Sequence, residues 1–525
     1  MKTFTFLFCF LFFTEAIIKA QTPNLQGQKA LGGTDNDFGM SMQQTADGGY
    51  IAAGITASFN GDVHGNNGDE DMWIVKLDKR GNIQWQNALG GFGDEGAFSI
   101  QQTNDGGYVA AGQANSFNGD VTGNHGNLDF WIVKLNTNGN LIWQKSLGGS
   151  DVDAATTIQQ TQDGGYIVGG NTESNDQQVA GNHGATDQWI VKLDAFGNIQ
   201  WSKTYGGSRN DFVYSIRQTN DGGYITAGNT NSNDGDITNV HDIVYGDFWI
   251  TKLDRRGNIV WQKTYGGGDY DQANSIQLTS DGGYIAAGWN RSNNGDVTNN
   301  HGNYDVWVIK ISSTGNLQWQ KSFGGSSGDL GYSVDVTSDN GYVVAGGTSS
   351  NNGNVTGNHG LEDFWIIKLT SNGTLQWQKT LGGSSFEEAR SVVQTRDGGY
   401  AALGYTASND GNVSGNHNPA YRDFWLIKLS SDAQSIATQN QNTALSVTTF
   451  TVSPNPASTF LNVHLSAQAT LLRIENSAGI TMFEKNISKN KEYDVQLNIS
   501  KLASGLYYVH VKCGNNVVIK KFVKE

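Results

Sequence analysis

One short sequence step recurs along most of this chain. Asp-Gly-Gly-Tyr, once with Asn in place of the first Gly, recurs with a spacing of 58 residues, and once of 60. It ends at Tyr50, Tyr108, Tyr166, Tyr224, Tyr284, Tyr342 and Tyr400. Two tryptophan series share the period and together account for 13 of the 14 tryptophans. A period of this length indicates a repeat architecture, in which each unit buries its apolar face against its neighbours.

Each unit predicts four short antiparallel strands. In the second unit we expect strands at 99–103, 108–112, 130–135 and 140–147, joined in pairs by tight turns that contain Gly and Asn. Four such strands repeated seven times predict an all-β protein with a seven-bladed β-propeller. An open stack, or one closed in another way, is the alternative.

The ends of the repeat region favour a closed ring. The seventh unit stops after 425–429 without its fourth strand, whereas residues 25–33 are an isolated copy of that strand with Gly27 in the place of Trp. The first segment can therefore complete the last blade and cover a strand edge that would otherwise promote aggregation. We expect the propeller to occupy residues 21–430.

Residues 1–20 have the features of a secretory signal peptide. Lys2 precedes an apolar stretch, and we expect cleavage after Ala20. The stretch is too short for a transmembrane helix, so none is expected in the mature chain. Cleavage leaves Cys513 as the only cysteine, which excludes disulfides within the chain.

The charge distribution divides the chain further. The formal net charge is −15, yet residues 445–525 carry more Lys and Arg than Asp and Glu. This change of sign predicts a linker over 431–444 and a small Ig-like β-sandwich over 445–525. Because the acidic remainder has no Lys and Arg cluster, nucleic acid is not an expected partner.

The C-terminal segment carries a set of specific short motifs. Their key residues are Pro454, Asn455, Pro456, Gly505, Tyr507, Lys520 and Lys521. In these motifs the segment resembles the C-terminal sorting domain of the Bacteroidetes type IX secretion system, in its type A-like form. The resemblance implies export across both membranes, the type IX secretion machinery as a partner, and a mature protein that is secreted or attached to the cell surface. It implies no catalysis.

The repeats resemble secreted bacterial and archaeal propeller proteins with Asp-Gly-Gly-Tyr turns and Trp-Gln-Lys strands. This resemblance covers residues 24–430 and implies a fold without naming an activity. The functional residues must therefore come from the pattern itself. In such blades, the loops from second to third strand and the connections between blades open on one face of the ring, and both are the long ones here.

An acidic residue follows the Gly-Gly step of every inter-blade connection. The series is Asp37, Glu95, Asp153, Asp211, Asp271, Asp329 and Glu387. A carboxylate at this position can accept backbone N–H bonds and fix the turn. Alternatively, the seven carboxylates form an acidic ring at the channel mouth that attracts Ca²⁺ or a cationic ligand.

The loops between the second and third strands suggest one cofactor, Ca²⁺. Asp62, Asp120, Asp236 and Asp296 offer carboxylate oxygens beside Asn side chains, which are ligands that Ca²⁺ accepts. The EF-hand spacing is absent, and three units replace this Asp. The six loop histidines come one to a blade, which is a poor arrangement for zinc, so we expect each to hydrogen-bond within its own loop.

A specific site has to break the sevenfold pattern, because equivalent carboxylates in similar environments cannot divide acid and base roles. The residues that break it are Trp289, Tyr405, Tyr214, Tyr332, Arg209, Arg390 and Glu388. Aromatic rings beside polar and charged groups are typical of a sugar-binding site. These seven residues are therefore the predicted ligand contacts.

Three functions fit these observations. The first is an exported, non-catalytic propeller that binds a glycan or another cell-surface ligand on its loop-rich face. The second is a carbohydrate-active enzyme, a glycoside hydrolase or polysaccharide lyase, that depends on Glu387, Glu388 or Arg390 in one blade. The third is a protein-binding scaffold or adhesin. No nucleophile elbow, zinc-protease helix, phosphate loop or dinucleotide motif is present.

Overall fold

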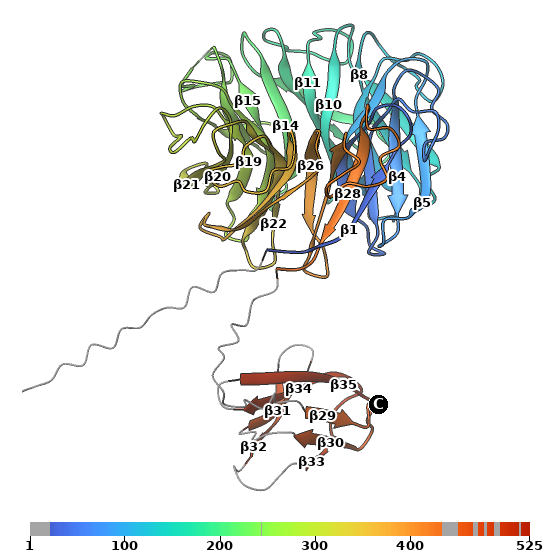
Figure 1. The fold of residues 1–525 in the computed structure, drawn as a ribbon, viewed down its shortest axis with the longest axis vertical. Helices are drawn as coiled ribbons and strands as arrows, with labels where there is room; N and C mark the ends of the chain where they lie inside the picture. The colour runs from blue at the N-terminus through green and yellow to red at the C-terminus, as the bar shows by residue number, and fades with distance from the viewer. Residues whose placement is uncertain are drawn as a thin grey trace, which may run out of the picture. The chain divides into compact units, whose positions relative to one another are not determined.

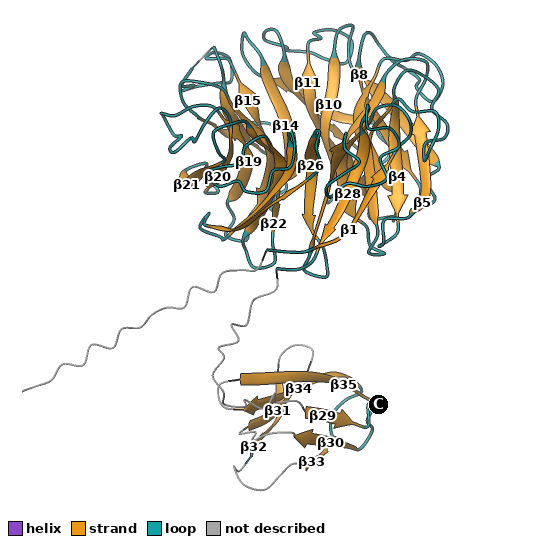
Figure 2. Cartoon of the chain, viewed as in Figure 1, coloured by secondary structure: helices purple, strands orange, loops and turns teal. Residues whose placement is uncertain are grey.

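The computed structural model describes residues 22–242, 244–432, 450–465, 471–476, 480–487, 494–513 and 516–525. The expected signal peptide and residues 433–444 of the expected linker lie outside this range. The chain divides into two compact units, Met1–Ile436 and Ala437–Glu525. The described residues form strands and no helix, so none of them offers an apolar helix long enough to cross a bilayer (Figure 2).

The first unit is a ring of seven four-stranded antiparallel sheets, which confirms the predicted propeller (Figure 1). The innermost strands are β2 (Asp37–Gln44), β6 (Glu95–Gln102), β10 (Asp153–Gln160), β14 (Asp211–Gln218), β18 (Asp271–Leu278), β22 (Asp329–Val336) and β26 (Glu387–Gln394). The second strands are β3 (Tyr50–Thr56), β7 (Tyr108–Ala114), β11 (Tyr166–Thr172), β15 (Tyr224–Thr230), β19 (Tyr284–Asn290), β23 (Tyr342–Thr348) and β27 (Tyr400–Thr406).

The outer half of each blade completes the ring. The third strands are β4 (Asp71–Leu77), β8 (Asp129–Leu135), β12 (Asp187–Leu193), β16 (Asp247–Leu253), β20 (Asp305–Ile311), β24 (Asp363–Leu369) and β28 (Asp423–Leu429). The outermost strands are β5 (Ile83–Leu89), β9 (Leu141–Leu147), β13 (Ile199–Tyr205), β17 (Ile259–Tyr265), β21 (Leu317–Phe323), β25 (Leu375–Leu381) and, in the seventh blade, β1 (Leu25–Leu31).

The recurring Asp-Gly-Gly-Tyr step makes the turn between the first two strands of a blade. In the second blade Gly106 has a φ of 81°, which a residue with a side chain rarely adopts. The Asp105 carboxylate accepts a 3.0 Å hydrogen bond from the Gly107 N–H and lies 3.0 Å from Nζ of the buried Lys134. The Asp therefore fixes the turn and neutralises a lysine from the third strand.

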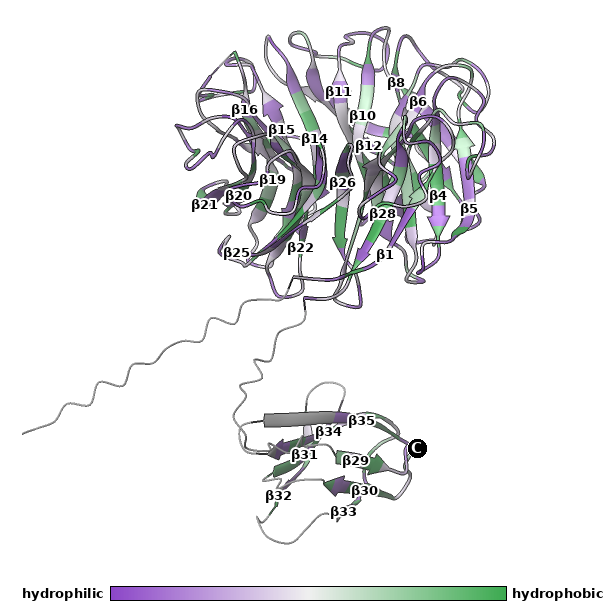
Figure 3. Cartoon of the chain, viewed as in Figure 1, coloured by the Kyte–Doolittle hydropathy of each residue, from purple (hydrophilic) through white to green (hydrophobic). Residues whose placement is uncertain are grey.

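The third-strand tryptophan fills the core of each blade. Trp131 is fully buried, and its indole N–H donates a 2.9 Å hydrogen bond to the side-chain oxygen of Gln144 on the outermost strand. Trp143, beside Gln144, packs on Tyr166 of the next blade with ring centroids 5.8 Å apart. Apolar side chains thus fill the space between blades, whereas hydrophilic residues dominate the connecting loops (Figure 3).

Strand β1 closes the ring, as the sequence predicts. It pairs antiparallel with β28, and Gly27 lies opposite Lys428, where Trp stands in the other blades. The indole N–H of Trp425 donates a 2.8 Å hydrogen bond to Gln28, the bond that Trp131 makes to Gln144. The seventh blade is therefore built from both ends of the repeat region.

A ring of hydrogen bonds links the seven innermost strands. A Ser or Thr hydroxyl in each strand accepts a hydrogen bond of 3.2–3.4 Å from a backbone N–H of the next blade. The last of these runs from the Met42 N–H to Ser391 Oγ, 349 residues apart in sequence. The bond confirms closure on the inner side of the ring.

The second unit is a small two-sheet domain. One sheet orders as β29 (Phe450–Ser453), β30 (Phe460–Leu465) and β33 (Asp494–Asn498), and the other as β32 (Thr481–Asn486), β31 (Leu471–Asn476), β34 (Gly505–Cys513) and β35 (Asn516–Lys524). Apolar side chains from both sheets form one core that includes Leu461, Leu472, Val509 and Phe522. The predicted small β-sandwich is confirmed.

The C-terminal motif residues lie on or beside the neighbouring strands β34 and β35. The Asn455 side chain accepts a 2.9 Å hydrogen bond from the Val523 N–H and donates one of 3.3 Å to the Lys521 carbonyl. Tyr507 is buried and stacks on Phe522 at 5.6 Å. Pro454, Pro456, Lys520 and Lys521 are exposed, and Gly505 pairs with Lys524 at the end of the β34–β35 ladder.

The closing hydrogen bond allows a test of the fold. Replacing Gln28 by Ala leaves the buried Trp425 N–H without its acceptor, so we expect a loss of about 1–3 kcal/mol in the free energy of unfolding. Chemical denaturation of the two proteins measures the change. Gln26→Ala is the control, because Gln26 is exposed on the same strand. Equal stabilities of the two variants would contradict closure by β1.

Candidate functional site

The loop-rich face carries the connections from second to third strands and those between blades. The seven acids of the inter-blade connections lie behind it, each at most 1% exposed. Asp37 accepts hydrogen bonds from the Gly33 N–H at 2.8 Å, from Ser58 Oγ at 3.0 Å and from the Thr56 hydroxyl. The carboxylates thus hold their turns, and their burial between blades leaves no open acidic ring at the channel mouth.

A second ring of buried carboxylates faces the first. At the last junction Asp423 and Asp37 converge on Gly32, where an added Cβ would clash with both carboxylates. His417 holds Asp423 Oδ2 through its backbone N–H and Nδ1, whereas Oδ1 has no hydrogen-bond partner among the described residues. The same orphaned oxygen occurs in Asp71, Asp129, Asp187, Asp247, Asp305, Asp363 and Asp423.

Burial makes these pairs sensitive to pH. It raises the pKa of Asp37 and of Asp71 to about 7, and the charge of the partner carboxylate adds to the increase. The first blade has Asn67 in place of the histidine, so a single backbone N–H holds Asp71 at 2.9 Å.

The loop histidines bind the third-strand acids of their own blades. In six blades the histidine Nδ1 lies 2.5–2.8 Å from the Asp Oδ2. This arrangement uses one ring nitrogen of every such histidine in the structure of its loop. The interaction accounts for the recurrence of His without a metal.

The four acids that suggested calcium lie apart from one another. Asp62, Asp120, Asp236 and Asp296 each have a carboxylate oxygen 3.2–3.4 Å from a glycine N–H of the preceding connection. Within the described residues, no three His, Cys, Asp or Glu side chains gather as metal ligands. These acids therefore lack the further acidic ligands that a calcium site of this kind would use.

Four of the predicted contacts meet in one polar cluster, formed by Tyr332, Glu362, Glu388, Arg390 and Tyr405. Arg390 Nη2 lies 2.5 Å from Glu388 Oε1, and the guanidinium lies 4.0 Å from the ring centroid of Tyr332. The Tyr405 hydroxyl donates a 2.8 Å hydrogen bond to Glu388 Oε2. The cluster joins the sixth and seventh blades at the loop-rich end of the channel wall.

Glu362 is the member that the sequence analysis missed. Glu362 stands directly before the third-strand Asp, a position that every blade has. Only in this blade is the neighbouring second-strand residue a glycine, Gly347. The Glu362 side chain occupies the space above it, because a Cβ on Gly347 would clash with Glu362 Oε1. Burial and then the neighbouring Glu388 raise the pKa of Glu362 to about 7. The sequence signal that could have revealed Glu362 is Gly347, which aligns with Trp289 in the fifth blade and with Tyr405 in the seventh.

The polar cluster contains unsatisfied groups. Glu362 Oε1 and Arg390 Nε are buried and have no hydrogen-bond partner among the described residues, and the same holds for Nε of the adjacent Arg422. Arg422 lies 5.7 Å from the Tyr405 ring. Buried polar groups without partners are rare in folded proteins, so this concentration marks a place where a polar molecule can bind.

Trp289 belongs to an aromatic cluster in the fifth blade, formed by Tyr270, Trp289, Arg291 and Tyr304. Tyr270 stacks on Trp289 at 5.3 Å, and Tyr304 meets its edge at 5.1 Å. The guanidinium of Arg291 lies 5.7 Å from the Tyr304 ring. The indole is half-buried, so a bound ring can still reach part of it.

The two remaining predicted contacts are in the fourth blade. Tyr214 stacks with Phe212 at 6.2 Å, and burial followed by the neighbouring Tyr270 raises its pKa. Arg209 is exposed on the inter-blade connection. The fourth and fifth blades thus bring Tyr214 near the aromatic cluster, and the structure places Arg209 outside the two clusters.

Three exposed phenylalanines on the loop-rich face were also missed. Phe59, Phe92 and Phe117 are 67%, 76% and 70% exposed. Phe92 and Phe117 lie on neighbouring loops, since the Phe92 N–H donates a 2.9 Å hydrogen bond to Asn118. Phe59 and Phe117 occupy the same place in the polar loops of the first two blades, which is the sequence signal that could have revealed them.

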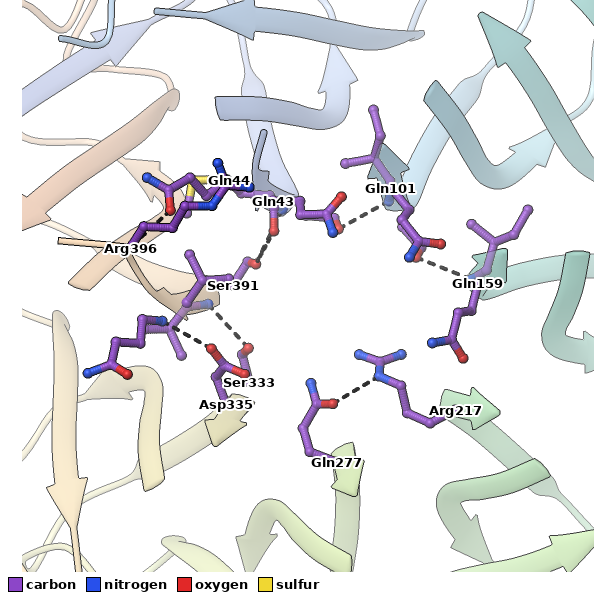
Figure 4. Close-up of a pocket in the computed structure, with 18 residues that line it drawn as sticks. Gln43, Gln44, Gln101, Gln159, Arg217, Gln277, Ser333, Asp335, Ser391 and Arg396 are labelled. Carbon is purple, nitrogen blue, oxygen red and sulfur yellow. Dashed lines mark hydrogen bonds between the residues drawn. The ribbon is translucent and has the colours of Figure 1, made fainter. Parts of the chain in front are cut away.

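A cavity of about 430 Å³ lies in the channel between the innermost strands (Figure 4). All seven innermost strands contribute to its lining. The residues at this level are Gln43, Gln101, Gln159, Arg217, Gln277, Asp335 and Val393. Most of the glutamines bond the next blade, as Gln43 does at 2.6 Å to the Gln102 N–H. This polar ring is chiefly structural.

Comparison with known proteins identifies the second unit. Residues 451–525 match the Secretion system C-terminal sorting domain family. These residues are a sorting domain. A sorting domain of this kind implies interaction with the type IX secretion machinery and export of the protein to a secreted or cell-surface location.

One curated protein matches the chain at low identity. Regulatory protein FlaEY of Caulobacter vibrioides is 25% identical over 361 residues, which cover 61% of this chain and 35% of that protein. The chain thus spans about a third of the length of this curated relative.

Solved structures match at low similarity. PorZ, a surface component of the type IX secretion system of Porphyromonas gingivalis, has 13% identity and a TM-score of 0.36, and the match covers 94% of this chain and 60% of PorZ. A fungal alcohol oxidase of the AA5 family, solved with copper, has 12% identity and a TM-score of 0.42 over 96% of this chain and all of its own. Neither match carries an inference about activity.

The buried carboxylate pairs predict a pH dependence of stability. The pKa of Asp71 is about 7 in the folded protein against an ordinary 3.8, so its contribution to stability is complete below about pH 4 and is lost as the pH rises through 7. Asp71→Asn removes the buried charge. We expect this variant to melt above the wild-type protein at about pH 8, with the difference shrinking toward pH 4.

Asp69→Asn is the matched control, because it makes the same change in net charge at an exposed position two residues away. Thermal melts of the three proteins across this pH range provide the measurement. Parallel pH profiles for wild type and Asp71→Asn would show that Asp71 keeps its ordinary pKa.

Proposed function

We propose that the propeller is the non-catalytic binding head of an exported protein and that its loop-rich face binds a glycan or another cell-surface ligand. The observation that carries this proposal is the position of the residues that break the sevenfold repeat. Six of the seven predicted contacts lie in or beside the polar and aromatic clusters, on one side of the ring. A protein without a ligand has no need to concentrate these exceptions.

The chemistry of the two clusters suits a sugar. The half-buried indole of Trp289, held between Tyr270 and Tyr304, offers a rigid apolar surface for the face of a sugar ring. The polar cluster offers carboxylate acceptors and guanidinium donors for hydroxyl groups. Aromatic surface beside a few polar groups is the usual composition of a small-ligand site.

A binding role fits the carboxylates better than a catalytic one. The seven acids of the inter-blade connections are equivalent and buried, so none differs from the others in the way that acid–base catalysis needs. Glu388 forms an ion pair with Arg390 at 2.5 Å and accepts a 2.8 Å hydrogen bond from the Tyr405 hydroxyl. A carboxylate held in this way is better suited to orient a ligand than to attack it.

Affinity gel electrophoresis of the mature chain tests the proposal. We expect polysaccharide-containing gels to retard the protein without loss of polymer staining, and Trp289→Ala or Arg390→Ala to weaken the retardation several-fold. Phe196→Ala is the control, since Phe196 is 74% exposed on a hairpin turn of the other face. Unretarded migration in every gel, together with capture of envelope proteins that depends on Phe59, Phe92 and Phe117, would instead favour a scaffold or adhesin.

One observation favours a carbohydrate-active enzyme as the second candidate. Burial and the neighbouring Glu388 raise the pKa of Glu362 to about 7, whereas Glu388 is ion-paired with Arg390, so the two neighbouring carboxyl groups lie in different environments. Such a pair is the pattern of a general acid and a second carboxylate in glycoside hydrolysis. This candidate makes Glu362, rather than the buried Glu387, the residue on which turnover depends.

The enzyme candidate has its own test. Glu362→Gln abolishes release of reducing ends from a cleaved polysaccharide if Glu362 is the acid. Glu70→Gln, at the same position in the first blade, leaves that activity unchanged. Activity that survives in Glu362→Gln, or clearing of no polymer by the wild-type protein, would rule the enzyme candidate out for the polysaccharides used.

A further inference from the structure

The junction at which the ring closes differs from the other six. At those six, an outermost-strand Trp packs on the Tyr that begins the second strand of the next blade, with centroids 5.3–6.3 Å apart. At the closing junction the Trp position is Gly27, opposite Lys428. Tyr50 therefore lacks the indole that covers every equivalent tyrosine.

The missing indole leaves a slot between the seventh and first blades. We call the space bounded by Gly27, Tyr50, Lys79, Arg80 and Gly81 the seam slot, and its volume is about 340 Å³. An added Cβ on Gly27 would meet no atom within 4 Å. The volume falls within the usual range of about 300–1,000 Å³ for ligand pockets.

The shape of the seam slot suits a flat ring. At the first junction, Gly139 of the next blade's outer hairpin lies against the indole of Trp85. Its equivalent at the seam, Gly81, meets only Leu426 and Lys29 at 3.7 Å. The Tyr and the hairpin glycine that flank an indole elsewhere are thus both present here, and the ring between them is missing.

The lining of the slot is cationic. Lys29, Lys79 and Arg80 are exposed at the slot, whereas Lys428 is engaged by Asp397 at 3.0 Å. Four cationic side chains and one carboxylate therefore line a slot on a chain whose net charge is −15. A carboxylate on the bound ring would find charge-assisted partners that the rest of the surface rarely offers.

We propose that the seam slot binds a uronic acid unit of an acidic polysaccharide, with the sugar ring beside Tyr50 and its carboxylate toward Lys79 and Arg80. Sugar hydroxyls match the polar lining, in which Gln26 and the Tyr50 hydroxyl stand beside a single aliphatic side chain, Leu426. The slot lies among the short hairpins, so the proposal is independent of the loop-rich face.

The decisive variant fills the slot. Gly27→Trp restores the residue of the other six junctions, so we expect it to fold, to melt at or above the wild-type temperature, and to lose affinity for a hexamer of galacturonic acid by at least about tenfold. Isothermal titration of the full mature chain measures the affinity. We expect a neutral cellulose hexamer not to bind in the slot of the wild-type protein or of the Gly27→Trp variant.

A matched pair of charge variants separates the slot from general attraction. Lys79→Ser with Arg80→Ser should weaken binding of the acidic hexamer by about tenfold. Arg255→Ser with Arg256→Ser removes the same charge from the same hairpin of the fourth blade, where Trp201 already fills the junction. This control should bind like the wild-type protein, and the basic end of the sorting domain is unchanged in both.

The outcomes either support or overturn the proposal. Loss in Gly27→Trp and in the Lys79/Arg80 variant, with the Arg255/Arg256 variant unaffected, supports it. Undetectable binding of the acidic hexamer, equal loss in both charge variants, or full binding by Gly27→Trp overturns it. Slot-dependent binding of an acidic peptide that contains tryptophan, without binding of the hexamer, also overturns it in favour of a protein partner.

Discussion

The pairing of β1 with β28 is the contact on which the whole propeller depends. Every other blade consists of consecutive strands, but the seventh exists only when residues near position 28 meet residues near 425. That meeting places Trp425 against Gln28 on the outside and lets Ser391 accept the Met42 N–H on the inside. The loop-rich face, the channel and the seam slot all take their geometry from a ring that is closed in this way.

The sequence predicted the parts of the fold that the repeat period encodes. Trp425 and Gly27 could be assigned because each occupies a known place in a repeated unit. Glu388 and Arg390 could be chosen as candidate contacts because both depart from that unit. The place of Glu362 in the polar cluster could not be predicted in this way. Its side chain enters the cluster through the space above Gly347, which is fifteen residues earlier in the sequence and lies on the second strand.

Burial also had to come from the structure. The recurrence of Asp37 favoured a structural turn and left an open acidic ring as the alternative, and its exposure of 0% and its three hydrogen-bond donors support the turn. The polar residues of the narrow channel were missed for a related reason. A bulge in each innermost strand, such as that between Ala97 and Ser99, changes which positions face the channel.

Closure by the first strand also imposes an order of events on the newly made chain. Residues 25–31 are synthesised early, whereas their partners, residues 423–429, are synthesised nearly four hundred residues later. Until the last blade is present, the growing chain has unpaired strand edges at both ends, which are sites for wrong pairing. The ring therefore cannot be completed before the last blade has been made, and a chain that ends before residue 423 cannot form the β1–β28 pairing.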